Sequence, residues 1–81
     1  MRQGHLELAL KDFDTAIELD PGIGEAYVNR GLILILFGRE TEAVRDLTKG
    51  MELKPEAKAD IEKRAELARR LSRDGAAVAK Q

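Results

Sequence analysis

Residues 24–57 read GEAYVNRGLILILFGRETEAVRDLTKGMELKPEA, two amphipathic segments that are separated at Gly38 and closed by Pro55. The first segment is apolar nearly all round over residues 32–37, which fits a helix buried between neighbours. A strand is the alternative for so short an apolar run, but a lone strand between helices would have nothing to pair with. Gly38 fits the left-handed position after a helix, and Pro55 fits the first position of the next helix. The stretch therefore predicts a helical hairpin.

The flanking segments have the same character. Residues 4–20 place apolar side chains at spacings of three and four and predict one helix, which Pro21 ends. Residues 56–73 predict a thinner, alanine-rich helix, and residues 74–81 are expected to form a flexible tail. We therefore expect one all-α domain over residues 1–73, with about four helices arranged as stacked antiparallel hairpins. Residues 4–20 would be the second helix of a truncated repeat, 24–57 a complete repeat and 56–73 a capping helix.

The chain matches itself when it is shifted by 34 residues. Residues 4–21 and 38–55 share six identities. The identical pairs are Gly4/Gly38, Ala9/Ala43, Asp12/Asp46, Glu18/Glu52, Leu19/Leu53 and Pro21/Pro55. A fixed period of this length indicates stacked helical hairpins, each of which buries its apolar side on the next.

The 34-residue unit resembles the tetratricopeptide repeat, and the resemblance extends from residue 4 to about residue 72. The residues that carry it are Tyr27, Gly31, Leu34, Ala43, Leu47 and Pro55. Gly31 and Ala43 would let the two helices of a hairpin approach closely. The chain departs from the pattern at Arg30, where the family usually has Leu. It departs again at Gly50, where Ala is usual and where glycine costs ~1 kcal/mol in a helix.

The resemblance implies a protein–protein interaction module that binds a peptide or helix in a concave groove. In the family, an Asn two residues after the leading aromatic holds the backbone of an extended peptide, and Asn29 matches that position. A carboxamide suits this role because it both donates and accepts a hydrogen bond. The groove candidates are Glu25, Val28, Asn29, Leu32, Ile33 and Lys63. Lys63 is the 34-residue counterpart of Asn29, but the clamp for chaperone tails also needs a preceding first helix, so chaperone binding is not predicted.

The helix at residues 4–20 has no hairpin partner in the sequence, because the chain opens inside a repeat. Two explanations stay open: the chain is a fragment of a longer array, or a second copy covers the exposed side in a homodimer. The self-association candidates are Leu6, Leu10, Phe13, Ile35 and Leu36. A structural module or scaffold fragment with no ligand of its own is therefore the alternative to the interaction role.

Composition argues against other classes of function. The chain has no cysteine and a single histidine, His5, so it lacks the parts of a thiol site, a Ser/His/Asp triad or a histidine-based metal site. Its net charge of −1 provides no overall field for nucleic acid or an anionic membrane. The longest apolar run is six residues, against the ~20 that span a bilayer. We expect no enzyme activity, no cofactor or metal, no nucleic-acid or membrane partner, and a cytoplasmic location.

Overall fold

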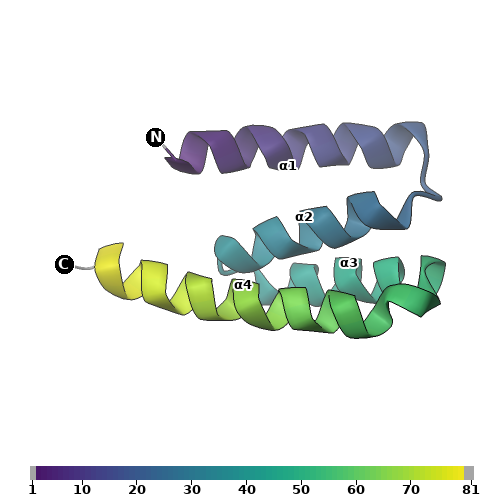
Figure 1. Cartoon of the computed structure of the whole chain (residues 1–81). Coiled ribbons are helices and arrows are strands. Elements are labelled where there is room, and N and C mark those ends of the chain that lie inside the picture. The colour runs from purple at the N-terminus through teal and green to yellow at the C-terminus, as the bar shows by residue number, and fades with distance from the viewer. Residues whose placement is uncertain (1, 80–81) are drawn as a thin grey trace.

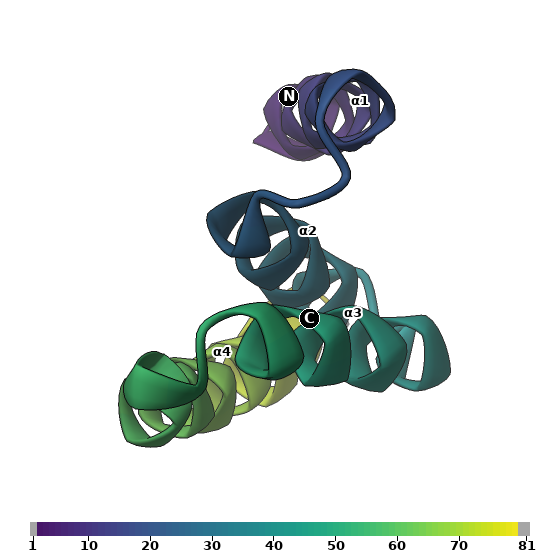
Figure 2. The ribbon, with the colours of Figure 1, turned by 90° about the vertical axis from the view of Figure 1, so that its right-hand side faces the viewer.

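The computed structural model describes the backbone of residues 2–79 and the side chains of residues 5–73. Its elements are α1 (Arg2–Leu19), α2 (Gly24–Leu36), α3 (Glu40–Leu53), the short 3-10 helix η1 (Pro55–Ala57) and α4 (Lys58–Ala79). Figure 1 shows α2 in the middle, with α1 on one side of it and α3 and α4 on the other. The view along the helices in Figure 2 shows the same order. The predicted all-α fold of stacked helical hairpins is confirmed, and residues 32–36 are helical rather than extended.

The turn between α2 and α3 depends on Gly38, whose φ is +79°. This left-handed conformation lets the amide of Gly38 donate to the carbonyl of Ile35, and the amide of Arg39 donate to the carbonyl of Leu34, both at 2.9 Å. The two bonds satisfy carbonyl groups that the end of a helix otherwise leaves without partners. The predicted left-handed cap at Gly38 is therefore confirmed.

The C-terminal part differs from the prediction in two details. Pro55 begins η1 rather than α4 itself, and the amide of Ala57 donates to the carbonyl of Lys54 at 3.0 Å. Helix α4 then continues to Ala79 instead of ending near Arg73. The added segment is rich in alanine, the best helix former, and this outweighs the cost of ~1 kcal/mol for the one glycine within it. The flexibility of residues 74–81 stays a prediction, and residues 80–81 lie outside the described part.

The core lies where α2, α3 and α4 meet. Its buried residues are Val28, Leu34, Ile35, Ala43, Leu47, Ile61, Ala65 and Ala68. Two glycines allow α2 and α3 to approach this closely. A Cβ atom on Gly31 would lie 2.9 Å from Cγ of Leu47, and one on Gly50 would lie 2.5 Å from Cγ2 of Val28. Any larger residue at either position would have to push the two helices apart or displace a core side chain.

Candidate functional site

Helix α2 contacts a different neighbour on each of its three sides. The side with Val28, Gly31 and Ile35 lies in the core against α3. The side with Arg30 reaches α1 through Asp14. The third side contacts α4, where Arg64 donates to the side-chain oxygen of Asn29 at 3.4 Å. The accessible parts of α2 are therefore the edge beside α4 and the surface at Tyr27, which lines an open hollow of about 650 Å³ together with residues of α3.

That edge has a repeating composition. On α2 it consists of residues 29, 33 and 36, which are spaced by four and then three positions. Residues 63, 67 and 70 of α4 lie 34 positions later and have the same spacing. We call this the α2–α4 face; its residues are Asn29, Ile33 and Leu36 on α2 and Lys63, Leu67 and Arg70 on α4. Figure 1 shows the two helices running side by side in the same direction. Two of its leucines are open to solvent, with Leu36 exposed by 36% and Leu67 by 52%.

A set of long ion pairs connects α2 to the elements beside it. Glu25 lies 3.5 Å from Nζ of Lys54 and 3.7 Å from Nη2 of Arg64. Asp60 lies 3.7 Å from Nη1 of the same Arg64. Pairs this long and this exposed contribute at most ~1 kcal/mol each. Their effect is positional, because they hold Arg64 against the side-chain oxygen of Asn29. The amide nitrogen of Asn29 has no hydrogen-bond partner among the described residues.

The surface of α4 is hollowed beside this face. The hollow has a volume of about 350 Å³, and its lining is mostly apolar area surrounded by charged groups. Leu67 lies among Lys63, Arg64 and Arg70, with Asp60 and Glu66 completing the lining. Neither Lys63 nor Arg70 forms an ion pair within residues 5–73. The α2–α4 face therefore combines exposed apolar surface, one carboxamide and two uncompensated cations.

The groove candidates from the sequence fall into two groups. Glu25 and Lys63 are exposed, and Asn29 and Ile33 are half-buried, so all four are open to a ligand. Leu32 is also half-buried, but it packs against the core. Val28 is only 1% exposed and lies against Gly50, so its side chain is not available to a ligand while the hairpin is intact.

The self-association candidates also divide. Leu6, Leu10 and Phe13 on α1 are half-buried, and Leu10 packs against the core. Ile35 is 2% exposed and belongs to the core itself. Leu36 lies on the α2–α4 face, at the end of the row that begins with Asn29. A helix places residues only one position apart on sides that differ by ~100°, so an all-apolar segment does not reveal which of its residues are buried.

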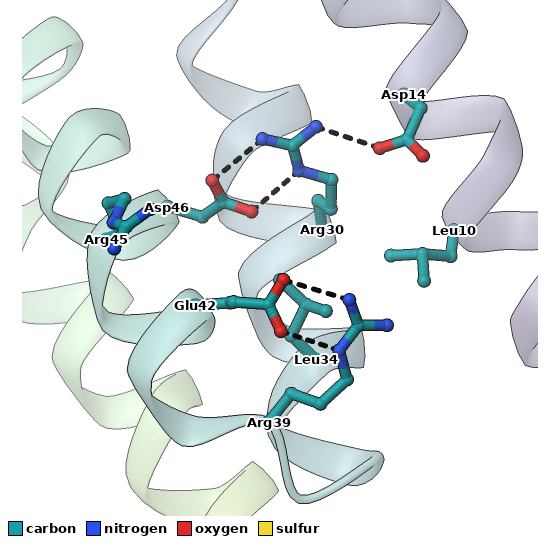
Figure 3. Close-up of a pocket in the computed structure, with 8 residues that line it drawn as sticks. All are labelled: Leu10, Asp14, Arg30, Leu34, Arg39, Glu42, Arg45 and Asp46. Carbon is teal, nitrogen blue, oxygen red and sulfur yellow. Dashed lines mark hydrogen bonds and ion pairs between the residues drawn. The ribbon is translucent and has the colours of Figure 1, made fainter.

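Sequence reasoning missed the role of Arg30, which was noted only as a departure from the family pattern. Figure 3 shows its guanidinium between α1 and α3. Nε and Nη2 donate to the two carboxylate oxygens of Asp46 at 2.7 and 2.8 Å, and Nη1 donates to Asp14 at 2.8 Å. The hydrogen bonds to Asp46, and the single one to Asp14, hold the pKa of Arg30 above its ordinary value although partial burial opposes the charge. The only signal in the sequence is that both aspartates lie 16 residues from Arg30.

This arginine forms one wall of a cleft between α1, α2 and α3. The cleft has a volume of about 280 Å³, and Leu10 and Leu34 contribute apolar surface to it. A second bidentate pair, Arg39 with Glu42 at 2.7 and 2.9 Å, lies at its other end (Figure 3). The carboxylates that line the cleft already accept hydrogen bonds from arginines. These pairs therefore join the helices around the cleft and leave no free reactive carboxylate among them.

The described residues contain no group of three or more His, Cys, Asp or Glu side chains arranged to hold a metal ion. Within the same part of the chain, no helix has both the length and the apolar character needed to cross a bilayer.

Comparisons with known proteins agree with the repeat. The family model described as tetratricopeptide repeat matches residues 24–57. Tetratricopeptide repeat protein 13 of Homo sapiens is 44% identical over 52 residues, which cover 64% of this chain and 6% of that protein. Protein STIP1 homolog of Dictyostelium discoideum is 44% identical over 48 residues, which cover 59% of this chain and 8% of that protein. The chain thus spans less than a tenth of the length of these relatives. No solved structure gives a significant match.

Proteins with this repeat are generally non-enzymatic scaffolds that bind other proteins or peptides. The hairpin of α2 and α3 lies within residues 24–57, which the family model matches. The close contacts at Gly31 and Gly50 explain why small residues are needed at these two positions of the hairpin. Residues 24–57 of the chain therefore form a tetratricopeptide repeat.

Proposed function

We propose that the chain is a protein-interaction module whose α2–α4 face binds a peptide or a helix. The observation that supports this most directly is the pair of matching rows on two adjacent helices, with Leu36 exposed by 36% and Leu67 by 52%. Exposed apolar surface bordered by polar groups is typical of protein-binding sites. The face also includes Asn29, which matches the position that the family resemblance implies for holding a peptide backbone.

Each group on the face has a separate role in this mechanism. The amide nitrogen of Asn29 donates to a carbonyl of the bound peptide, while Arg64 keeps the carboxamide in place through its oxygen. Ile33, Leu36 and Leu67 contribute apolar contact area, which supplies most of the affinity. Lys63 attracts a carboxylate of the ligand and fixes its register, because no acidic group within residues 5–73 pairs with it.

The test uses a displayed library of random peptides selected on the immobilised full chain. Affinities of the enriched peptides are then measured by calorimetry for the parent chain, for Asn29→Ala and for Leu67→Ala. We expect each variant to bind at least about fivefold more weakly, since an unpaired carbonyl or a lost apolar contact costs ~1 kcal/mol or more. Lys49→Ala, an exposed change on α3 away from the face, is the matched control and should leave the affinity unchanged.

Far-UV circular dichroism must show that the helical content of all three variants is the same. If the enriched peptides bind Asn29→Ala and Leu67→Ala as tightly as the parent chain, the α2–α4 face is not the binding site. If Lys49→Ala alone weakens binding, the ligand instead contacts α3.

A self-associating structural role is the second candidate, and one observation favours it. Leu8 and Leu19 are 62% and 82% exposed on α1, and their separation of 11 residues is about three helical turns, so they lie on one side of the helix. This role predicts a homodimer with twice the 9.0 kDa mass of the chain. Sedimentation equilibrium at tens of micromolar separates the two candidates. If the parent chain is a dimer and the Leu19→Glu variant is a monomer, the self-associating role is favoured. If the parent chain is a monomer, the peptide-binding role is favoured.

A further inference from the structure

Helix α4 contains the only serine of the chain, Ser72, and two arginines precede it. Residues 69–72 read Arg-Arg-Leu-Ser, so arginines lie two and three positions before the serine. None of the three threonines of the chain has arginine at both of these positions. Kinases select substrates by charge patterns, and an acidic substrate cleft can pair with two guanidinium groups placed in this way. The sequence therefore contains one position that fits an arginine-directed protein kinase.

The part of α4 around Ser72 is held loosely by the rest of the molecule. Ala68, which is 7% exposed, belongs to the core, whereas none of residues 69–73 is buried and Leu71 is 54% exposed. Figure 1 shows that the last turns of α4 extend past the end of α2. A segment with few buried contacts opens locally at a small part of the cost of global unfolding. A kinase can therefore take up residues 69–72 in an extended form while the hairpin of α2 and α3 stays folded.

The groups that a kinase would use are accessible. Ser72 is half-buried, and it lines a hollow of about 200 Å³ together with Glu40, Arg69 and Arg73. Arg70 is exposed and forms no ion pair within residues 5–73, so its guanidinium is available for an acidic partner.

Thr48 shows how the fold separates two candidates that the sequence leaves open. It lies three residues after Arg45, so it shares one of the two arginine positions of Ser72. It is inside α3, between Leu47, which is 3% exposed, and Gly50, which is buried. Extending the chain around Thr48 would separate α3 from α2 and break the core. The folded chain is therefore open to modification at Ser72 and protected from it at Thr48.

We propose that Ser72 is a phosphorylation site for an arginine-directed serine/threonine kinase. The hydroxyl oxygen of Ser72 attacks the γ-phosphorus of magnesium-bound ATP. The new oxygen–phosphorus bond forms as the bond from that phosphorus to the β,γ-bridging oxygen breaks, ADP leaves, and the hydroxyl proton passes to the catalytic carboxylate of the kinase. Arg69 and Arg70 fix the register by pairing with acidic groups of the kinase cleft.

The phosphate acts on a contact between α4 and the first turn of α3. Nε of Arg69 donates to Oε2 of Glu40 at 2.7 Å, and Nη2 of Arg69 lies 2.6 Å from the same oxygen. Arg69 and Ser72 are three residues apart and therefore neighbours on the surface of the helix. A phosphoserine has a charge of about −1.5 to −2 and three acceptor oxygens, so it attracts Arg69 more strongly than a single carboxylate does. Phosphorylation therefore draws Arg69 away from Glu40 and loosens α4 from α3.

The test incubates the full chain with magnesium, ATP and the catalytic subunit of the cyclic-AMP-dependent protein kinase, which represents this class of kinase. Mass spectrometry of the intact chain and of its fragments counts and locates the phosphates. We expect one phosphate per chain, on Ser72, and none in Ser72→Ala. Arg70→Gln should lower kcat/KM at least about tenfold, the effect of losing a charged hydrogen bond. Arg73→Gln, which changes an exposed arginine on the other side of the serine, should leave kcat/KM unchanged.

The effect on Arg69 is followed through the side-chain Nε–H resonances of the isotope-labelled chain. Phosphorylation should shift the resonance of Arg69 and leave that of Arg30, which stays bound to Asp46. An unchanged Arg69 resonance in the phosphorylated chain would overturn the competition with Glu40.

Three outcomes would overturn the site itself. The first is phosphate on Thr48 or another threonine in place of Ser72. The second is equal loss of kcat/KM in Arg70→Gln and Arg73→Gln, which would indicate attraction between net charges only. The third is phosphorylation of a synthetic peptide of residues 66–77 but not of the full chain, which would show that α4 does not open. These measurements use no peptide ligand, so they are independent of the role proposed for the α2–α4 face.

Discussion

Replacing Gly50 with alanine tests the packing of the hairpin against simple helix propensity. Position 50 is inside α3, where alanine is favoured over glycine by ~1 kcal/mol. The structure predicts the opposite sign. A Cβ at this position would lie 2.5 Å from Cγ2 of Val28 and 3.3 Å from the carbonyl oxygen of Gly24. Val28 is 1% exposed and β-branched, so it has little freedom to rotate away.

The size of the effect follows from these two opposing contributions. Forcing an extra methyl group into a packed interface costs ~1–3 kcal/mol. Subtracting the propensity gain of ~1 kcal/mol leaves Gly50→Ala about 1 kcal/mol less stable than the parent, within a range of roughly 0 to 2. For a domain of this length, 1 kcal/mol corresponds to a decrease in Tm of about 4–8 °C.

The assay is urea and thermal unfolding followed by circular dichroism at helical wavelengths, applied to four chains. These are the parent, Gly50→Ala, Val28→Ala and the double variant. Val28→Ala alone should cost ~2 kcal/mol because it leaves a cavity. In the double variant the new methyl group occupies part of that cavity, so we expect a favourable coupling energy of ~1–2 kcal/mol.

Two results would refute this reasoning. If Gly50→Ala raises the free energy of unfolding by ~1 kcal/mol, propensity governs the position and the close contact has no energetic effect. If the two changes are additive within ~0.5 kcal/mol, Val28 is not the residue that opposes the methyl group.

Three further predictions concern the polar contacts and the turn. Arg30→Met should lower the free energy of unfolding by ~2 kcal/mol in urea titrations, because it leaves Asp46 buried without its partner; no change would show that the pair adds nothing. Arg39 holds the pKa of Glu42 below its ordinary 4.5, so this pair stabilises the fold above that pH and loses its effect as the pH falls through the lowered value. In carboxyl NMR titrations, Arg39→Gln should therefore raise the pKa of Glu42, and an unchanged pKa would contradict the pairing. Gly38→Ala should cost ~1 kcal/mol of stability through its φ of +79° alone, since nothing lies within 4 Å, and Gly38→Asn should cost less.

Local chemistry was sufficient to predict the helices and their turns. Gly38 and Pro21 restrict the backbone whatever surrounds them, so their positions define where α2 and α1 end. The 34-residue period then predicted how the helices stack, because equivalent residues form equivalent contacts. This is why Ala43 and Gly31 lie at the hairpin contact, as the resemblance implied.

The candidate site was harder to predict because it depends on which neighbour covers each side of a helix. Val28 and Ile35 are as apolar as Ile33 and Leu36, yet the first two are buried in the core and the other two border the α2–α4 face. The partners of Arg30 depend on the spatial relation of three helices, and the sequence contains only a spacing of 16 residues in each direction.

The same repeat produces opposite surfaces at the two sides of the stack. Helix α4 has Glu62 and Arg69 where α2 has Val28 and Ile35, so the side of α4 that could receive another helix is charged. Such a surface is stable in water. Helix α1 instead retains Ala9, Phe13 and Ala16, which match enclosed residues of α3. The exposed side of α4 is therefore charged and suited to water, whereas the matching side of α1 keeps an apolar pattern with a single carboxylate.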